Sequence, residues 1–360
     1  MRAFFGVALR TIEWIPEHEY VRMIDQRVLP RRMEYLICRT AEEMTTAIKN
    51  MAIRGAPAIG VAGAYGLVLA ANRCGVGIDA EIRRELDLTG RMLISARPTA
   101  INLEWGVKRL LAIVNDPMNP VASLAELLLL AANRMAEEDI QTNLQLSEFG
   151  AGLIEDGDTI IHHCNTGSLA VVEWGTALGA IRFAHEHGKR VHLLVDETRP
   201  CLQGSRLTAW ECEQYGIPYE IITDNAAGYF LRSGQVQKVF FGADRVAANG
   251  DVVNKVGTYM LSLSAHSNGV PVYSVFPRST VDLAIANGDL IPIEERNIDE
   301  VLDLEFKGES VAPEGAKARN PAFDVTPHEL ITALVTEVGV IRPPFLENLA
   351  RCVYNSKLDN

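Results

Sequence analysis

The sequence changes character at residues 156–167, which read DGDTIIHHCNTG. The turn dipeptide Asp156-Gly157 is followed by a short run rich in β-branched residues, a combination typical of a buried strand. A cysteine and the polar segment Asn165-Thr166-Gly167, which can open a helix, come next. Before this stretch apolar residues recur at helical spacing, and after it strand and helix patterns alternate. The two parts of the chain are therefore expected to fold differently.

Four further apolar runs follow the first strand, each separated from the next by a segment of helical pattern. Regular strand–helix units with short connections imply right-handed crossovers and a parallel sheet covered on both faces. A (β/α)₈ barrel would need eight such units, which this part of the chain does not contain. The sequence therefore predicts an α/β fold with an open, Rossmann-like, doubly wound sheet, whose strands are expected at 159–163, 191–195, 219–223, 239–241 and 270–276.

The part of the chain before residue 155 is predicted to be mainly helical, with a short antiparallel sheet formed by segments near 4–14 and 34–38. Glycines at three-residue spacing (Gly60, Gly63 and Gly66) favour close helix packing. We expect two domains, a mainly helical N-terminal domain at 1–145 and a Rossmann-like catalytic domain at 146–360. Helices are predicted at 41–51, 57–72, 79–96, 99–114 and 120–149, and the pattern from Thr326 predicts another helix start.

Composition excludes several classes of protein. The 360 residues include 34 Lys and Arg against 46 Asp and Glu, a formal net charge of -12, and no long basic run. Nucleic-acid and anionic membrane partners are therefore not expected. The six cysteines are irregularly spaced without a CxxC, which argues against a structural zinc site or a disulfide scaffold and predicts a soluble protein of the reducing cytoplasm.

Polar residues follow each predicted strand of the parallel sheet. In an open sheet of this kind ligands bind at the carboxyl ends of the strands. These strand ends are therefore the expected location of an active site, although any single polar residue there can simply cap the next helix. The strand-end segments are 164–167, 196–199, 223–225, 242–245 and 276–280.

Cys164 is the first candidate for chemistry. A thiolate is favoured at a helix N-terminus, and strand alternation places His162 on the same side of the strand, so that a Cys–His pair is conceivable. A packed core cysteine explains the position equally well. A metal site built from His162, His163 and Cys164 is disfavoured, because successive strand residues point to opposite faces.

Asp244 is the second candidate. It follows an apolar strand, and a carboxyl group in apolar surroundings has a raised pKa that suits a general acid. An ion pair with Arg245 or a helix cap is the alternative interpretation.

Three segments suit an anion. Arg54, Gly55 and Ala56 precede a helix with proline in its first turn, which makes a phosphate seat. Asn254 and Lys255 precede the next long helix, and Arg97 lies in a turn between two helices. No GxxxxGK[ST] or strand-linked GxGxxG motif occurs, so nucleotide triphosphatases and dinucleotide enzymes lack support.

Long motifs give these residues a family context. The chain resembles the S-methyl-5-thioribose-1-phosphate isomerases of methionine salvage, which are related to regulatory subunits of the exchange factor for translation initiation. The resemblance runs nearly end to end. It rests on 54–61 (RGAPAIGV), 96–103 (ARPTAINL), 163–170 (HCNTGSLA), 196–200 (DETRP), 203–210 (QGSRLTAW), 242–251 (GADRVAANGD), 254–259 (NKVGTY) and 320–327 (NPAFDVTP).

The resemblance implies an aldose–ketose isomerase that acts on a sugar phosphorylated at its anomeric carbon. Cys164 and Asp244 match the family's catalytic residues, and hydrogen transfer as a proton or as a hydride stays open. The resemblance also implies no metal and no organic cofactor, and a homodimer. The matching substrate-binding positions are Arg54, Gly55, Ala56, Arg97, Gln203, Asn254 and Lys255.

Three rival functions are considered. A sister isomerase could act on 5-deoxyribose 1-phosphate or ribose 1,5-bisphosphate; Arg278, which departs from the family's usual pattern, is the one evident spare cation for a second phosphate. A non-catalytic regulatory subunit for translation initiation would share the fold, but the chain keeps Cys164 and Asp244 within their full motifs. A generic cofactor-binding Rossmann protein is disfavoured by the missing glycine fingerprint.

Overall fold

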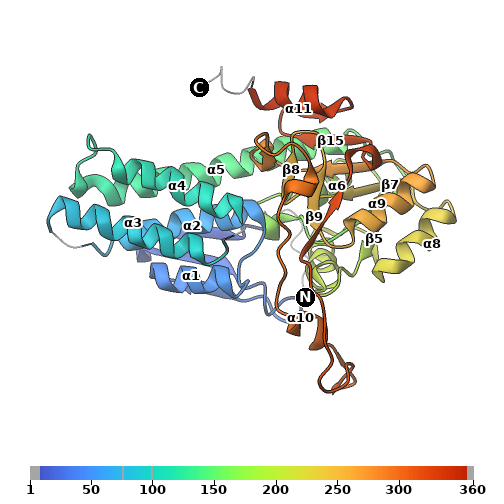
Figure 1. Ribbon diagram of the computed structural model, residues 1–360, viewed down its shortest axis with the longest axis horizontal. Helices are drawn as coiled ribbons and strands as arrows, with labels where there is room; N and C mark the ends of the chain where they lie inside the picture. Colours follow the sequence, from blue (N-terminus) through green and yellow to red (C-terminus); the bar gives the residue numbers. More distant parts are fainter. Residues whose placement is uncertain (1–8, 75–76, 99, 355–360) are drawn as a thin grey trace. The chain divides into compact units, whose positions relative to one another are not determined.

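The computed structural model describes residues 9–74, 77–98 and 100–354, and these form two compact units. The N-terminal unit contains the described residues up to Leu144 together with the segment Gly167–Gly175. The C-terminal unit contains Gln145–Thr166 and the described residues from Thr176 onward. Figure 1 follows the chain through both units by colour. Within the described ranges, no helix combines the length and the apolar character that a membrane span requires.

A three-stranded antiparallel sheet opens the N-terminal unit. Its middle strand β2 (Tyr20–Ile24) pairs with β1 (Ile12–Ile15) on one side and β3 (Tyr35–Cys38) on the other. The segments predicted near 4–14 and 34–38 both contribute strands, but they do not pair with each other, because β2 lies between them. Residues 4–8 of the first segment lie outside the described ranges.

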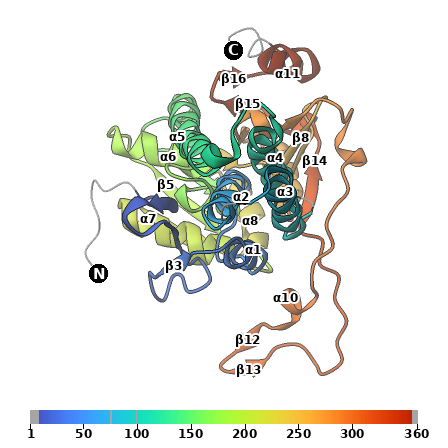
Figure 2. The same ribbon diagram turned by 90° about the vertical axis from the view of Figure 1, so that its left-hand side faces the viewer.

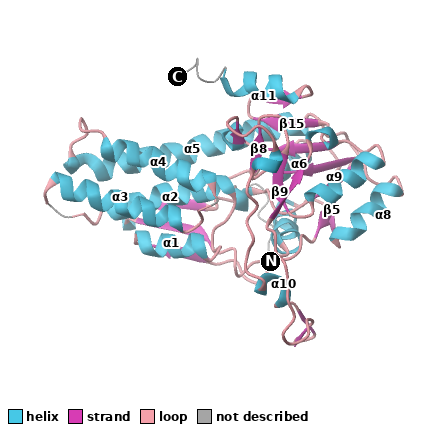
Figure 3. Ribbon diagram, viewed as in Figure 1, coloured by secondary structure: helices cyan, strands magenta, loops and turns pink. Residues whose placement is uncertain are grey.

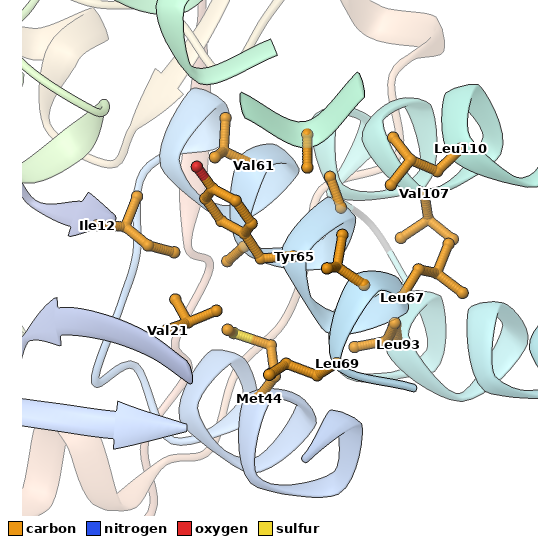
Figure 4. Close-up of a cluster of buried hydrophobic side chains, with 14 of the residues drawn as sticks. Ile12, Val21, Met44, Val61, Tyr65, Leu67, Leu69, Leu93, Val107 and Leu110 are labelled. Carbon is orange, nitrogen blue, oxygen red and sulfur yellow. The ribbon is translucent and has the colours of Figure 1, made fainter. Parts of the chain in front are cut away.

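The helix α2 (Ala56–Ala71) is the centre of this unit. It is apolar on all sides, and thirteen of its sixteen residues are buried, which identifies it as a core helix rather than an amphipathic surface helix. Figure 4 shows its side chains Tyr65, Leu67 and Leu69 among residues of the sheet and of the neighbouring helices. Around it lie α1 (Ala41–Lys49), α3 (Asp79–Ser95) and α4 (Ile101–Asn115), followed by α5 (Leu124–Ala151), all five helices being close to the predicted ranges.

The glycines of α2 allow this packing. A Cβ on Gly60 would lie 2.8 Å from the carbonyl oxygen of Asn102 on α4, and one on Gly63 would lie 2.7 Å from the Leu103 side chain. At Gly66 the obstacle would be Leu93 of α3, also at 2.7 Å. Close helix packing, predicted from the glycine spacing, is confirmed, and it brings the first turns of α2 against the start of α4.

A seven-stranded sheet forms the core of the C-terminal unit (Figure 3). Its strands follow the order β16-β15-β10-β7-β4-β5-β6, and all adjacent pairs are parallel except β15 with β16. The predicted open, doubly wound sheet is therefore confirmed. The strands are β4 (Thr159–His162), β5 (His192–Asp196), β6 (Tyr219–Ile222), β7 (Lys238–Phe241), β10 (Val272–Val275), β15 (Ala333–Thr336) and β16 (Gly339–Ile341).

Helices connect these strands. They are α6 (Ala177–Glu186), α7 (Ala209–Tyr215), α8 (Ala227–Arg232), α9 (Thr258–Ser267) and, at the end of the described chain, α11 (Phe345–Tyr354). The residues of β7 and β10 are all buried, as expected for strands covered on both faces. Fully buried aromatic side chains such as Phe241 and Phe276 pack in this core.

A second, four-stranded sheet was not predicted from the sequence. It is formed by β8 (Arg245–Ala247), β9 (Val252–Lys255), β11 (Val281–Asp282) and β14 (Phe323–Thr326), in the order β11-β8-β9-β14. The helix predicted from Thr326 is wrong: Thr326 ends β14, and a single 3₁₀ turn, His328–Leu330, leads directly into β15. The backbone N–H of His328 donates to the Asp251 carboxylate instead of to a helix-capping side chain.

The segment before β14 forms a short projection from the C-terminal unit. Figure 2 shows α10 (Asp299–Leu302) and the hairpin of β12 (Glu305–Phe306) and β13 (Glu309–Ser310) extending away from the four-stranded sheet.

Candidate active site

Cys164 lies two residues beyond the end of β4 in a left-handed backbone conformation, with φ of 67°. This conformation costs a non-glycine residue about 1–2 kcal/mol. The surrounding structure holds it in place: the Cys164 N–H donates to Thr198 Oγ1 at 2.9 Å, and the Thr208 hydroxyl donates to the Cys164 carbonyl at 2.7 Å. Backbone strain enforced by neighbours is common at functional sites and fixes the direction of the side chain.

The thiol of Cys164 meets a second predicted site residue. Its Sγ lies 3.5 Å from Gln203 Oε1, which accepts a hydrogen bond from the thiol, and the cysteine is buried. Gln203 directly precedes a π-helical turn, Gly204–Thr208, and Gly204 packs so tightly against the backbone of Asp196 that a Cβ there would overlap it. The structure therefore brings together a predicted catalytic residue and a predicted substrate-binding residue.

His162 is not the partner of this thiol. Its Nε2 lies 2.9 Å from Thr166 Oγ1, which also accepts the N–H of Leu178. Because the ring is completely buried and lies next to His163, its pKa is lowered to about 3, so His162 is neutral at physiological pH. The Cys–His pair considered from strand alternation is wrong, because the left-handed turn at Cys164 breaks the alternation on which it depended.

His163, which the sequence suggested only as part of a disfavoured metal site, is a further functional candidate. Its ring is buried, and Nδ1 lies 2.8 Å from Asp196 Oδ2 while Nε2 lies 3.0 Å from the carbonyl oxygen of Val256. Burial by itself lowers the pKa of His163, but the hydrogen bond and charge of Asp196 outweigh it, so the pKa is raised. Burial raises the pKa of Asp196 to about 6. The hydrogen bond and the charge of His163 act in the opposite direction and limit this increase.

Asp224, from the end of the next strand, completes this cluster. Its two carboxylate oxygens accept the N–H groups of Thr198, at 2.7 Å, and Arg199, at 2.8 Å. His163, Asp196 and Asp224 bring three potential metal-ligand atoms within 4.8 Å of one another. Hydrogen bonds engage His163 Nδ1, Asp196 Oδ2 and both Asp224 oxygens, while Asp196 Oδ1 is buried without a hydrogen-bond partner among the described residues. The hydrogen-bonded groups act as a brace beneath the turn that carries Cys164.

Asp244 lies at the same edge of the large sheet as Cys164. It follows β7, which is the parallel neighbour of β4 with His162 opposite Phe240. The two strand-end segments touch: a Cβ on Gly242 would lie 2.7 Å from the Thr166 methyl group. Arg245, the alternative ion-pair partner of Asp244, points its guanidinium to Asp282 at 3.8 Å. Cys164 and Asp244 thus lie on adjoining strand-end segments of the large sheet.

Asn254 and Lys255 end β9, the strand next to the Asp244 segment. The backbone N–H of Asp244 donates to the Val253 carbonyl at 2.9 Å, which ties the two segments together. Asn254 is buried and donates to Thr258 Oγ1 at 3.0 Å. Lys255 is also buried, and its ammonium lies 4.8 Å from the centre of the Phe323 ring. A buried cation of this kind suits an anionic ligand.

The remaining predicted residues lie in the N-terminal unit. Arg54 is buried, Gly55 has φ of 97° and packs directly on the Ala170 backbone, and Ala56 is the first residue of α2. Arg97 is half-buried in the turn before α4. Since the start of α4 packs on the first turns of α2, these residues lie toward one end of the unit, where helix N–H groups favour anions.

Comparison with known proteins places these residues in a family. The sequence matches the profile of the Initiation factor 2 subunit family over residues 52–343. Methylthioribose-1-phosphate isomerase of Synechococcus sp. is 46% identical over 335 residues, which cover 93% of this chain and 96% of the relative. The protein of the same name from Thermotoga neapolitana is 48% identical over 342 residues, which cover 95% of this chain and 97% of the relative.

Solved structures agree with the sequence comparison. The crystal structure of 5-methylthioribose 1-phosphate isomerase from Pyrococcus horikoshii OT3 has a TM-score of 0.90 and 39% identity, and covers 98% of both chains. A crystal structure described as translation initiation factor eIF-2B, subunit delta, from A. fulgidus has a TM-score of 0.85 and 42% identity, and covers 96% of this chain and 99% of its own. The chain therefore belongs to the Initiation factor 2 subunit family and, within it, to the methylthioribose-1-phosphate isomerases.

Proposed function

We propose that this chain converts S-methyl-5-thio-α-D-ribose 1-phosphate into S-methyl-5-thio-D-ribulose 1-phosphate, an aldose–ketose isomerisation of methionine salvage. The relatives that carry this name match nearly the whole chain. The observation that supports the chemistry is the adjoining position of the Cys164 and Asp244 segments at the carboxyl edge of the sheet.

The phosphate on the anomeric carbon determines what the residues must do. It locks the sugar ring, so the enzyme has to assist ring opening before hydrogen can move between the two carbons. Asp244 is proposed as the acid that protonates the ring oxygen, and Cys164 as the group that acts at the reacting carbons. Asp196 and its neighbours are buried away from water, so their hydrogen bonds form a fixed frame around the thiol.

Substrate binding is assigned to the remaining matched positions. Arg54, Arg97 and Lys255 supply positive charge, and guanidinium groups bind phosphate through paired hydrogen bonds. Gly55 and Ala56 offer backbone N–H groups at the start of α2. Gln203 and Asn254 contribute amide groups, of which Gln203 also holds the thiol.

One observation weighs against the bisphosphate rival. Arg278, the spare cation for a second phosphate, donates from Nε to Glu337 Oε1 at 2.8 Å, and Glu337 Oε2 accepts the Arg278 backbone N–H. Its charge is therefore already balanced by a largely buried carboxylate, which supports a substrate with an uncharged 5-substituent.

The experiment is turnover of three sugar phosphates by the purified protein, followed by phosphorus NMR. The proposal expects the ketose product from S-methyl-5-thioribose 1-phosphate at the highest kcat/KM. Faster turnover of 5-deoxyribose 1-phosphate or ribose 1,5-bisphosphate would assign the chain to a sister isomerase. No turnover of any of them would favour the regulatory role suggested by the name of the A. fulgidus structure.

We also propose a homodimer. Four large apolar side chains are exposed on α8 and α9, two helices that contact each other: Tyr229, Tyr259, Met260 and Leu263. An apolar surface of this kind suits an interface between copies of the chain. Sedimentation equilibrium should give twice the mass of one chain, and a concentration-independent monomer mass would contradict it.

The cytoplasm is the proposed compartment. All six cysteines of the chain are free thiols, and Cys38, Cys164 and Cys212 are buried. Free thiols persist in a reducing compartment, and fractionation of the source cells tests the assignment.

A further inference from the structure

We propose that His163 is a positioning residue that ties the catalytic turn at Cys164 to the segment 254–258, which carries Asn254 and Lys255. This inference rests on the proposed function, because it explains how two groups of that site are held in register. His163 is not among the residues assigned above to catalysis or to substrate binding.

The hydrogen-bond partners of the ring define its protonation. The Val256 carbonyl can only accept, so Nε2 must carry a hydrogen. A second hydrogen lies between Nδ1 and the Asp196 carboxylate, 2.8 Å away. The buried pair therefore keeps both hydrogens, and His163 is a cross-link between a carboxylate on β5 and a carbonyl just beyond β9.

On one side the cross-link fixes Cys164. His163 is its immediate neighbour, and Asp196 holds both residues: its carboxylate binds the His163 ring, while its carbonyl accepts the Thr198 hydroxyl, which in turn accepts the Cys164 N–H. The left-handed backbone at Cys164 needs such support, because without it the residue would relax to an ordinary conformation.

On the other side the cross-link fixes the segment 254–258. The His163 ring binds the Val256 carbonyl and lies so close to Gly257 that a Cβ there would be 2.8 Å from Cε1 of the ring. Gly257, with φ of 104°, also donates its N–H to Asp324 Oδ2 at 2.7 Å. The segment after Lys255 is therefore gripped between the His163 ring and the Asp324 carboxylate.

Two variants separate the two hydrogen bonds. In His163→Asn the amide nitrogen takes the place of Nδ1 and keeps a donor toward Asp196, but the donor to Val256 is lost. In His163→Gln the amide nitrogen takes the place of Nε2 and keeps the donor to Val256, but the donor to Asp196 is lost. His328→Asn is the matched control, because it makes the same substitution at another histidine whose Nδ1 lies 2.9 Å from a carboxylate oxygen, Asp251 Oδ1, and should likewise keep a donor there.

The kinetic constants give the first test. His163→Asn should raise KM about tenfold with kcat within about threefold, since the Lys255 segment is released, and displacements of about 1 Å have effects of this size or larger. His163→Gln should lower kcat by about 10–100-fold with KM within about threefold, because the Cys164 turn is released. His328→Asn should leave both constants within about twofold. Wild-type constants for both His163 variants, or equal changes in kcat and KM in both, would overturn the proposal.

A second readout does not require turnover and so separates this inference from the proposed function. The alkylation rate of Cys164 by iodoacetamide, followed by peptide mass, should change at least about fivefold in His163→Gln and stay within about twofold in His163→Asn and His328→Asn. Asp196→Ala, which removes the side-chain partner of Nδ1, replaces His163→Gln if the latter does not fold, with the same result expected. An unchanged rate in the folded variant that lacks the Asp196 link would overturn the proposal even if the wild-type enzyme turns over its substrate. Absence of wild-type turnover with the predicted alkylation pattern would instead refute the function and keep the link.

Discussion

The thiol of Cys164 donates a hydrogen bond to the side-chain oxygen of Gln203, with Sγ and Oε1 separated by 3.5 Å. Gln203 therefore has two roles in the proposed site, as a substrate contact and as the acceptor that orients the reactive sulfur. A carboxylate in the same place would oppose formation of the thiolate, because two negative charges at this distance repel each other strongly in a poorly solvated site.

Gln203→Glu tests this relationship. The variant should raise the pH midpoint of Cys164 alkylation by about one to two units, because the added charge stabilises the protonated thiol. Peptide mass mapping after iodoacetamide treatment from pH 6 to 10 measures the midpoint. Gln141→Glu, on an exposed position of α5, is the control and should leave it unchanged. Equal midpoints in both variants would show that Gln203 does not face the sulfur.

Gly55→Ala tests the close packing of Gly55 at the start of α2. Gly55 has φ of 97° and lies directly on the Ala170 backbone, so a methyl group would meet both strain and a collision. Gly157→Ala is the matched control, because its φ is 94° and nothing lies within 4 Å of the added methyl group. The Gly157→Ala control should lower the free energy of unfolding by about 1–2 kcal/mol and the melting temperature by a few degrees. Gly55→Ala should lower it at least twice as far; equal losses would contradict the predicted collision.

Arg97→Ala and Arg54→Ala test phosphate binding. Each loses charge-assisted hydrogen bonds worth about 1.5–3 kcal/mol, so KM should rise by about 10–100-fold. Steady-state kinetics with the methylthio substrate measures this. Arg190→Ala removes an exposed arginine that pairs with Asp156 and serves as the control. A KM equal to that of the control in either variant would remove that arginine from the binding site.

Asp139 gives a prediction about pH and stability. This carboxyl on α5 accepts the Val172 N–H at 2.7 Å, and burial raises its pKa from 3.8 to about 7 although that hydrogen bond lowers it. Because the folded-state pKa lies above the unfolded one, the stability that the protonated group provides is complete below about pH 4 and is lost as the pH rises through 7. The stability of Asp139→Asn should therefore improve relative to wild type by up to about 1.4 kcal/mol per pH unit across this window.

Urea denaturation midpoints at pH 4 to 8 measure the Asp139 effect. Glu137→Gln, an exposed carboxyl on the same helix, is the control and should track the wild type at every pH. A constant difference between Asp139→Asn and wild type over the whole range would show that Asp139 does not titrate in this window.

Much of the fold could be predicted because local patterns determine it. The strands of the large sheet are short apolar runs that end in polar residues, and the helix α2 has an apolar sequence that only a core position explains. The four-stranded sheet could not be predicted, because β11 and β14 come from distant parts of the chain to join the β8–β9 pair, and its strands are only two to four residues long. The helix expected from Thr326 failed for the same reason, since pairing of β14 with β9 outweighs the local preference.

The sequence supplies the candidate site residues but not their supporting contacts. Cys164, Gln203 and Asp244 could be found because they end parallel strands or follow them within recognisable motifs. The interaction of His163 with Asp196 depends on the strand register, in which His162 is opposite Val195, so that the next residues of the two strands lie side by side. The strand ends expected from the sequence, at 163 and 195, do not give this register, because β4 ends at His162 while β5 includes Asp196. The turn at Cys164, in contrast, reverses the expected direction of its side chain, and no sequence pattern signals it.

The central claim is that Cys164 and Asp244 carry out the isomerisation, and rapid-quench turnover of Cys164→Ala and Asp244→Asn with the methylthio substrate tests it most directly. Both variants should keep the wild-type melting temperature within about 3 °C and bind the substrate, while ketose formation falls by at least about 10³-fold. A folded variant of either residue that still forms the ketose within about tenfold of the wild-type rate would contradict the assigned role of that residue.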